Sequence, residues 1–318
     1  MTRRNGARRA APIALAVGLL LIGATTTIGK QFSAWSTAQP VDGTVNTAAA
    51  LEGCPIESPD GLSLYIASNR AGNVGGSTDP NDIWVSTRSS IDAPWGAPVN
   101  LGAPVNSAAA DFCPTPLPGK RLLFVSNRPT GNCGTAPAGD IYLARLSPAH
   151  GWQIQHLGCD ADGSGPNFPG GEFGPSLVET AQGTFLYFSS SGYGGDQNIY
   201  ASRMRPDGTF EAAVAVTRLN SAADDFMPNV RKDGLEMVMN SNRAGSTLNP
   251  VTGLPSQDIY TAHRSSTAEA WSTPDKLGSA INTGGNETRS SLSRDGSRLH
   301  FGRDGDIYVS GRVHDPGP

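Results

Sequence analysis

The sequence predicts an all-β fold that is built from five copies of one four-stranded unit. Two observations support this prediction. An aromatic residue opens each copy, and successive openings lie between 57 and 61 residues apart, at Trp35, Trp95, Trp152, Phe210 and Trp271. A fixed period of this size is typical of repeat architectures and propellers. The chain is also rich in glycine (39) and proline (24) but only 16% charged, which suits short strands joined by many turns.

Each copy contains four short stretches with the composition of β-strands. In the second copy they cover residues 112–117, 122–126, 141–146 and 152–157. Aliphatic and aromatic residues fill these stretches, and glycine, proline, asparagine or aspartate bounds them. One small antiparallel sheet cannot bury both of its faces, whereas sheets stacked around an axis can. The sequence therefore predicts a five-bladed β-propeller of four-stranded antiparallel blades over residues 34–312.

The fifth copy lacks a fourth strand, because the chain ends soon after Tyr308 and Val309. Segment 34–41, with the sequence AWSTAQPV, has the composition of the missing strand. We therefore expect the N-terminal strand to close the last blade. This closure joins both ends of the chain and removes an open sheet edge.

Three recurring motifs carry a resemblance to a known family. They are SPDGLSLYIASNR at residues 58–70, W-x-x-P-x-x-L-G at 271–278, and the Asp-Ile-aromatic strands that begin at Asp82, Asp140, Asp258 and Asp306. The repeat resembles the WD40-like propeller repeat of TolB-type proteins over nearly all of residues 35–312. This resemblance implies a propeller but no single function, because the family includes docking domains, gating domains of peptidases and sugar-acting enzymes.

The first 33 residues have the features of an export segment and a linker. A positive cluster precedes an apolar run at residues 10–22, and it consists of Arg3, Arg4, Arg8 and Arg9. This order predicts a signal peptide, with a retained membrane anchor as the alternative. We expect a secreted, envelope or periplasmic protein and a disordered tail at 313–318. The net charge of −4 argues against a nucleic-acid partner.

Export permits disulfides, and the repeat predicts how the four cysteines pair. Cys133 lies in the loop after the second strand of copy two, and Cys159 lies in the crossover that follows this copy. Cys54 and Cys113 occupy equivalent places in neighbouring first strands. We therefore expect disulfides Cys133–Cys159 and Cys54–Cys113. A zinc site is not expected, because the chain has no Cys-x-x-Cys and no histidine is recognised near the cysteines.

A carboxylate opens the first strand of every copy. These five residues form the acid ring, which comprises Glu52, Asp111, Glu172, Asp225 and Glu287. Because first strands line a propeller's channel, the acid ring could bind a cation or a polar substrate. The favoured interpretation is structural, since an arginine follows the second strand of three copies and can neutralise the acid, at Arg70, Arg128 and Arg243.

Copies three and five depart from this pattern. Ser191-Gly192 replaces the Asn-Arg pair in copy three, and copy five has only Arg303 at a shifted place. His300 stands where other copies have Leu123, Tyr187 or Val238, and a structural histidine is the favoured interpretation. If the protein is an enzyme, its candidate catalytic residues are Glu172, Glu287, Asp225 and His300.

Loop lengths predict which face carries a ligand site. Turns between first and second strands are tight, whereas the loops after the second strands and the crossover 158–171 are long and irregular. Variable loops on a rigid scaffold carry binding sites, so we expect the site on the long-loop face, near Asp79, Asp162 and Asp196. In the crossover, oxygens of Asp160, Asp162 and Ser164 have the spacing of the first half of a calcium loop. The closing glutamate is absent from its position, so a polar turn is favoured over calcium, the only cofactor the sequence suggests.

The sequence favours a binding or docking module over an enzyme. It contains no Gly-x-Ser-x-Gly motif, and its five histidines lack the spacing of metal ligands. We expect a monomer that binds a protein or a cell-envelope polymer and that contacts a membrane only through an N-terminal anchor. The alternative is a carbohydrate-active hydrolase or lyase that uses channel carboxylates.

Overall fold

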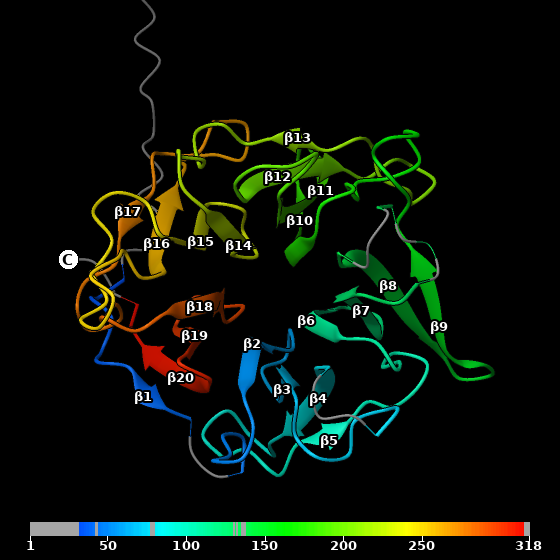
Figure 1. The fold of residues 1–318 in the computed structure, drawn as a ribbon, viewed down its shortest axis with the longest axis horizontal. Helices are drawn as coiled ribbons and strands as arrows, with labels where there is room; N and C mark the ends of the chain where they lie inside the picture. The colour runs from blue at the N-terminus through cyan, green and yellow to red at the C-terminus, as the bar shows by residue number, and fades with distance from the viewer. Residues whose placement is uncertain are drawn as a thin grey trace, which may run out of the picture.

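The computed structural model describes residues 32–41, 44–76, 80–129, 131, 133, 134 and 138–314. All regular elements within these ranges are β-strands, and they form five four-stranded antiparallel sheets around a central axis (Figure 1). The predicted five-bladed propeller is therefore confirmed. In the described residues no helix is long and apolar enough to cross a membrane. The predicted export segment lies outside these residues, except for its last two positions.

Each blade begins with an inner strand and proceeds outward. Blade one contains β2 (Glu52–Glu57), β3 (Ser63–Ser68), β4 (Asp82–Thr87) and β5 (Val99–Asn100). Blade two contains β6 (Asp111–Leu117), β7 (Arg121–Ser126), β8 (Asp140–Ser147) and β9 (Gly151–His156). Blade three contains β10 (Glu172–Thr180), β11 (Gly183–Ser190), β12 (Asn198–Arg203) and β13 (Val214–Ala215). Blade four contains β14 (Asp225–Val230), β15 (Glu236–Ser241), β16 (Asp258–His263) and β17 (Asp275–Lys276).

Blade five is completed by the N-terminal strand, as the sequence predicted. Its strands are β18 (Glu287–Leu292), β19 (Arg298–Arg303), β20 (Asp306–Gly311) and β1 (Gln39–Pro40). Gln39 lies opposite Val309 in the antiparallel β1–β20 pair, and Val41 N–H donates to Ile307 O at 2.9 Å. Both ends of the described chain therefore meet in one sheet, which closes the ring (Figure 1).

Every inner strand contains a bulge at its third residue. The register of its pairing shifts there, and the third residue has a positive φ of 45–60°, at Cys54, Cys113, Gly174, Met227 and Arg289. A bulge bends the strand and redirects one side chain. In consequence, the side chains of different blades meet in the channel: Cys54 bonds to Cys113, and Arg289 reaches blades two and three. The centre of the propeller is therefore filled at this level.

Apolar side chains pack between neighbouring blades in five clusters. Trp271, for example, is buried with Tyr187 of blade three and Met239 of blade four. The other aromatic residues that open the copies also belong to these clusters, namely Trp35, Trp95, Trp152 and Phe210. Burial of these large rings contributes to the hydrophobic stabilisation between blades.

Candidate functional site

Arginine pairs neutralise four of the five carboxylates of the acid ring. The pairs are Glu52–Arg70 (2.9 Å), Asp111–Arg128 (2.7 Å), Asp225–Arg243 and Glu287–Arg303 (2.8 Å). Each guanidinium also lies over an aromatic ring of its third strand, on Trp84, Tyr142, Tyr260 and Tyr308. Because these acids are buried and charge-compensated, they hold the strands together. Asp225 and Glu287 are therefore committed to ion pairs.

Among the described residues, Glu172 in blade three has no arginine partner. Its Oε1 accepts hydrogen bonds from Phe168 N (3.0 Å) and Ser190 Oγ (2.8 Å), whereas Oε2 has no partner among the described residues. The centroid of the Phe168 ring lies 4.7 Å from the centroid of the Tyr200 ring. Tyr200 is the blade-three equivalent of the aromatic residues that carry a guanidinium in the other blades. Burial raises the pKa of Glu172 well above its usual value, and the charge of Asp140 contributes. Glu172 is thus a buried acid for which the neutral form is favoured.

His300 lies away from the acid ring, near the opposite end of the inner strands. It pairs with Ser291, the fifth residue of β18, and its Nε2 lies 3.8 Å from Oε1 of Glu57. Glu57 is already bound by Arg88 and Arg298. Burial lowers the pKa of His300 to about 4, so the imidazole is neutral at physiological pH. His300 is therefore not brought together with the three candidate acids, Glu172, Asp225 and Glu287.

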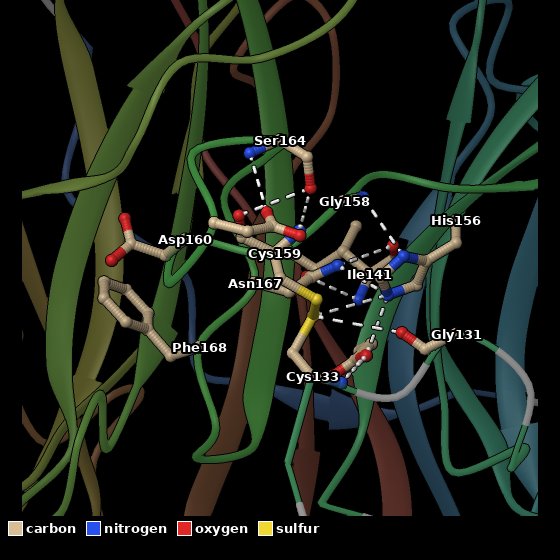
Figure 2. The surroundings of a disulfide bond; sticks show 12 residues. Gly131, Cys133, Ile141, His156, Gly158, Cys159, Asp160, Ser164, Asn167 and Phe168 are labelled. Carbon is tan, nitrogen blue, oxygen red and sulfur yellow. Dashed lines mark hydrogen bonds and ion pairs between the residues drawn. A yellow bond between two sulfur atoms is a disulfide. The ribbon is translucent and has the colours of Figure 1, made fainter.

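The crossover 158–171 is a polar turn tied to its neighbours. Oδ1 of Asp162 accepts from Ser164 N (2.9 Å), and Oγ of Ser164 accepts from Cys159 N (2.9 Å). Asp160 instead accepts from Tyr193 OH (2.8 Å) and Ala213 N (3.1 Å). Figure 2 shows Asp160 and Ser164 pointing in different directions. Oxygens of all three residues thus accept hydrogen bonds from the loop and its surroundings.

Both predicted disulfides, Cys54–Cys113 and Cys133–Cys159, are present. The expectation that no histidine lies near the cysteines was wrong. His156 Nε2 lies 3.7 Å from Cys133 Sγ and 2.8 Å from Asp140 Oδ2 (Figure 2). The ligand atoms of Cys133, His156 and Cys159 all lie within 4.8 Å of one another. The His-x-x-Cys spacing of His156 and Cys159 was the missed signal. Cysteine binds zinc in its thiolate form, and sulfurs that are joined in a disulfide are not thiolates.

A shallow basin of about 360 Å³ lies over the channel on the long-loop face. We call it the long-loop basin, and its centre is lined by Phe112, Phe173, Met227 and the Cys54–Cys113 disulfide. The rings of Phe112 and Phe173 are 5.8 Å apart. Glu52 is the only charged residue among the described residues that line it, and this acid is paired with Arg70. The basin is therefore largely apolar.

Exposed apolar side chains surround this face. They include Leu51 beside the basin and four residues of the long loops, Tyr193 (67% exposed), Leu248 (59%), Val251 (91%) and Leu254 (66%). Of the acids expected near the site, Asp162 and Asp196 are exposed on these loops, and Asp79 lies outside the described residues. The long loops thus offer apolar contact surface with a few carboxylates.

A second pocket, of about 250 Å³, opens at the other end of the channel, and loop-length reasoning missed it. We call it the turn-face pocket. All five blades line it through the ends of their inner strands and the turns that follow. Its polar residues include Thr115, Ser176 and Asn229, and its cations are Arg121, Lys232 and Arg294. The sequence did contain a signal for this pocket. Lys232 and Arg294 stand in blades four and five at the turn position that Pro59 occupies in the Ser-Pro-Asp-Gly turn of blade one.

No protein-family model matches this chain, and no curated protein matches it. Among solved structures, a thermostable family-43 glycoside hydrolase is 15% identical, with a TM-score of 0.52 over 89% of this chain and 98% of that chain. An alpha-L-arabinofuranosidase from Lactobacillus brevis is 13% identical, with a TM-score of 0.52 over 83% and 90%. One from Podospora anserina, in complex with cellotriose, is 12% identical, with a TM-score of 0.51 over 88% and 97%.

At these identities the likeness shows the fold alone. The resemblance to the TolB-type repeat is accordingly confirmed at the level of a five-bladed propeller. The two disulfides agree with the predicted export, because such bonds form and persist in oxidising compartments.

Proposed function

We propose that this chain is an exported binding module that holds a polymer of the cell envelope, of carbohydrate character, in the long-loop basin. The observation that carries the proposal is the chemistry of the basin. Phe112 and Phe173 present aromatic surface there, and four of the five carboxylates of the acid ring are engaged in ion pairs. Aromatic side chains in a concave site suit the apolar faces of sugar rings.

The carbohydrate class is supported by the solved structures with the same fold. Those described above are named as a glycoside hydrolase and arabinofuranosidases. A shared fold is an analogy, so it supports the ligand class and not a reaction. A protein partner remains an outcome of the test, because the exposed Val251 and Leu254 also suit protein contact.

Binding of the purified protein to envelope polysaccharides, measured by calorimetry and on glycan arrays, tests this proposal. Phe112→Ala and Phe173→Ala are each expected to weaken binding about tenfold or more, because buried aromatic contacts dominate such sites. Val214→Ala, which removes exposed apolar surface on the outer strand of blade three, serves as the control. Equal affinity in all four proteins would contradict the proposal, and capture of a protein ligand alone would redirect it.

Carbohydrate hydrolysis is the second candidate function. Two observations favour it: the fold shared with glycoside hydrolases and the raised pKa of Glu172, which suits a general acid. The common mechanism also needs a second carboxylate about 5–10 Å away. Asp111, Asp225 and Glu287, however, are bound to arginines. Release of reducing sugar by the wild type, and its loss in Glu172→Gln, would establish hydrolysis.

A further inference from the structure

Exposed cations line the turn-face pocket, and a buried guanidinium, that of Arg289, bonds to Thr115 in its lining. We propose that this pocket binds an anionic ligand, one that presents a carboxylate or phosphate group. Arg289 provides a positive charge beneath the floor, and Lys232 and Arg294 contact the ligand from the rim. The site lies at the opposite end of the channel from the long-loop basin, so it stands or falls independently of the proposed function.

Arg289 is fully buried without a counter-charge. It is the third residue of β18, and the bulge there turns its side chain into the channel. Its Nη2 donates to Thr115 Oγ1 (2.9 Å) and Pro175 O (3.4 Å). In the described part of the chain, its Nε and Nη1 have no hydrogen-bond partner, and no carboxylate forms an ion pair with it. The guanidinium thus reaches Thr115, a residue that lines the turn-face pocket.

Gly174 makes room for this guanidinium. A Cβ at this position would lie 2.5 Å from Nη1 of Arg289. The equivalent residues of the other blades are Cys54, Cys113 and Met227, none of which is charged. The Arg289–Gly174 combination is therefore a departure from the repeat that places one cation at the centre of the ring.

The energetics of Arg289 favour an anion nearby. Burial lowers its pKa to about 9, which still leaves the group protonated at neutral pH. An uncompensated buried charge is costly, and attraction to an opposite charge is strong where water is limited. An anion in the pocket offsets this cost, whereas a neutral ligand does not.

The rim adds charge that the protein leaves unpaired. Lys232 and Arg294 are exposed, and neither forms an ion pair or hydrogen bond with the described part of the chain. Of the acids that line the pocket, Glu57 is bound by two arginines and Glu179 is exposed. The pocket is thus locally positive, although the chain carries a net charge of −4. The side-chain nitrogen of Asn229 also has no partner in the described residues, and it can donate to a ligand oxygen.

Calorimetric titration with inorganic phosphate, D-galacturonate and neutral D-galactose tests the site. We expect phosphate, galacturonate or both to bind in this pocket, D-galactose not to bind there, and anion affinity to fall as salt rises. The double variant Lys232→Gln/Arg294→Gln is expected to lose at least about tenfold in affinity. Arg218→Gln removes an exposed cation on the crossover after blade three, and it should change affinity less than about twofold.

The two anions distinguish the chemistry of the ligand. Binding of galacturonate alone assigns a carboxylate, and binding of phosphate alone assigns a phosphate group. Absence of binding by both anions would overturn the proposal, as would an anion affinity that is unchanged in the double variant. Binding of D-galactose would overturn it only if the double variant weakens that binding equally, because a sugar in the long-loop basin does not contact Lys232 or Arg294.

Arg289→Met provides a second and independent test. If the buried charge of Arg289 serves to attract an anion, the Arg289→Met variant should have an equal or higher melting temperature than the wild type in anion-free buffer. It should also lose the rise in melting temperature that the bound anion causes. A purely structural arginine gives the opposite pattern, in which melting falls and anion affinity is unchanged. That pattern would remove Arg289 from the site.

Discussion

Replacement of Glu172 by glutamine should stabilise the protein, and increasingly so as pH rises. In the folded state Oε1 accepts two hydrogen bonds, and no described residue donates to Oε2. A glutamine side chain has the shape of the protonated acid and keeps the same acceptor. Because Glu172 is fully buried beside the Phe168 ring, the neutral side chain suits this site better than the carboxylate.

The direction of this stability change and its dependence on pH follow from the raised pKa of Glu172. In the unfolded chain this group ionises near its usual value of 4.5, whereas in the folded protein it holds its proton to higher pH. The contribution of Glu172 to the free energy of unfolding is therefore fully present below about pH 4.5. It is lost as pH rises through the pKa that Glu172 has in the folded protein. The loss amounts to about 1.4 kcal/mol per pH unit at most. Glu172→Gln removes this loss, so its advantage over the wild type should grow with pH by up to the same slope.

Glu52→Gln is the matched control, because it makes the same substitution at the equivalent position of blade one. Glu52 is paired with Arg70 at 2.9 Å, and breaking a buried pair costs about 3–5 kcal/mol. Urea denaturation of the three proteins between pH 5 and 9 measures both effects. A loss in Glu172→Gln as large as that in Glu52→Gln, or a difference from wild type that does not change with pH, would refute this reasoning.

Three further predictions concern closure, disulfides and His300. Deletion of residues 34–41 removes β1 from blade five and should lower the melting temperature by at least about 5 °C; an unchanged melt would contradict the closure. Cys54→Ala/Cys113→Ala should lose about 4 kcal/mol in denaturant unfolding and Cys133→Ala/Cys159→Ala somewhat less, because their separations are 59 and 26 residues; the reverse order would contradict the chain-entropy account. The pKa of His300 is lowered to about 4, so stability should be full above about pH 6.5 and fall by about 3 kcal/mol toward pH 4. His300→Leu should flatten this acid limb, and an identical limb in both proteins would place its origin elsewhere.

The five-bladed fold could be predicted from the sequence because the same features recur in successive copies of the repeat. The aromatic openings, the tight turns and the Asp-Ile-aromatic strands each recur at fixed positions. The fifth blade's missing strand could be found because one segment with the right composition remained at the other end of the chain. The two disulfides followed from the same register, since Cys54 and Cys113 occupy equivalent bulge positions.

The pairing of Glu287 was only partly predictable. Arg303 lies opposite Glu287, at the position that Ser68 occupies opposite Glu52, two residues before the equivalent of Arg70. From this earlier position it donates through Nε rather than Nη2 and still reaches the carbonyl of Ile281, as Arg70 reaches Val45. A guanidinium offers several donors, so a shifted arginine can make the same contacts. Sequence register alone does not show this adjustment.

The turn-face pocket was not predictable from loop length. The turns that border it are uniformly tight, and loop length is a guide to variable backbone rather than to side-chain charge. Lys232 and Arg294 occupy the position of Pro59 in turns of the same length. Arg289 is less visible still, because only the bulge in β18 directs it inward. Such sites require knowledge of where the side chains point.

The retention of an acid in blade three, where the arginine is missing, shows which contact the repeat requires. In every blade the acid accepts a hydrogen bond from a backbone N–H of the preceding crossover, at Thr47, Ser107, Phe168, Ser221 and Thr283. This bond fixes the crossover to the inner strand and satisfies a donor in a place with little water. The arginine adds a second tie, and blade three replaces it with the Phe168 ring. An acceptor oxygen at this position is therefore required by the fold in all five blades, so the recurrence of an acid there is no evidence for catalysis. Chemistry specific to this protein is to be sought where one blade differs from the rest, at Glu172 and at Arg289.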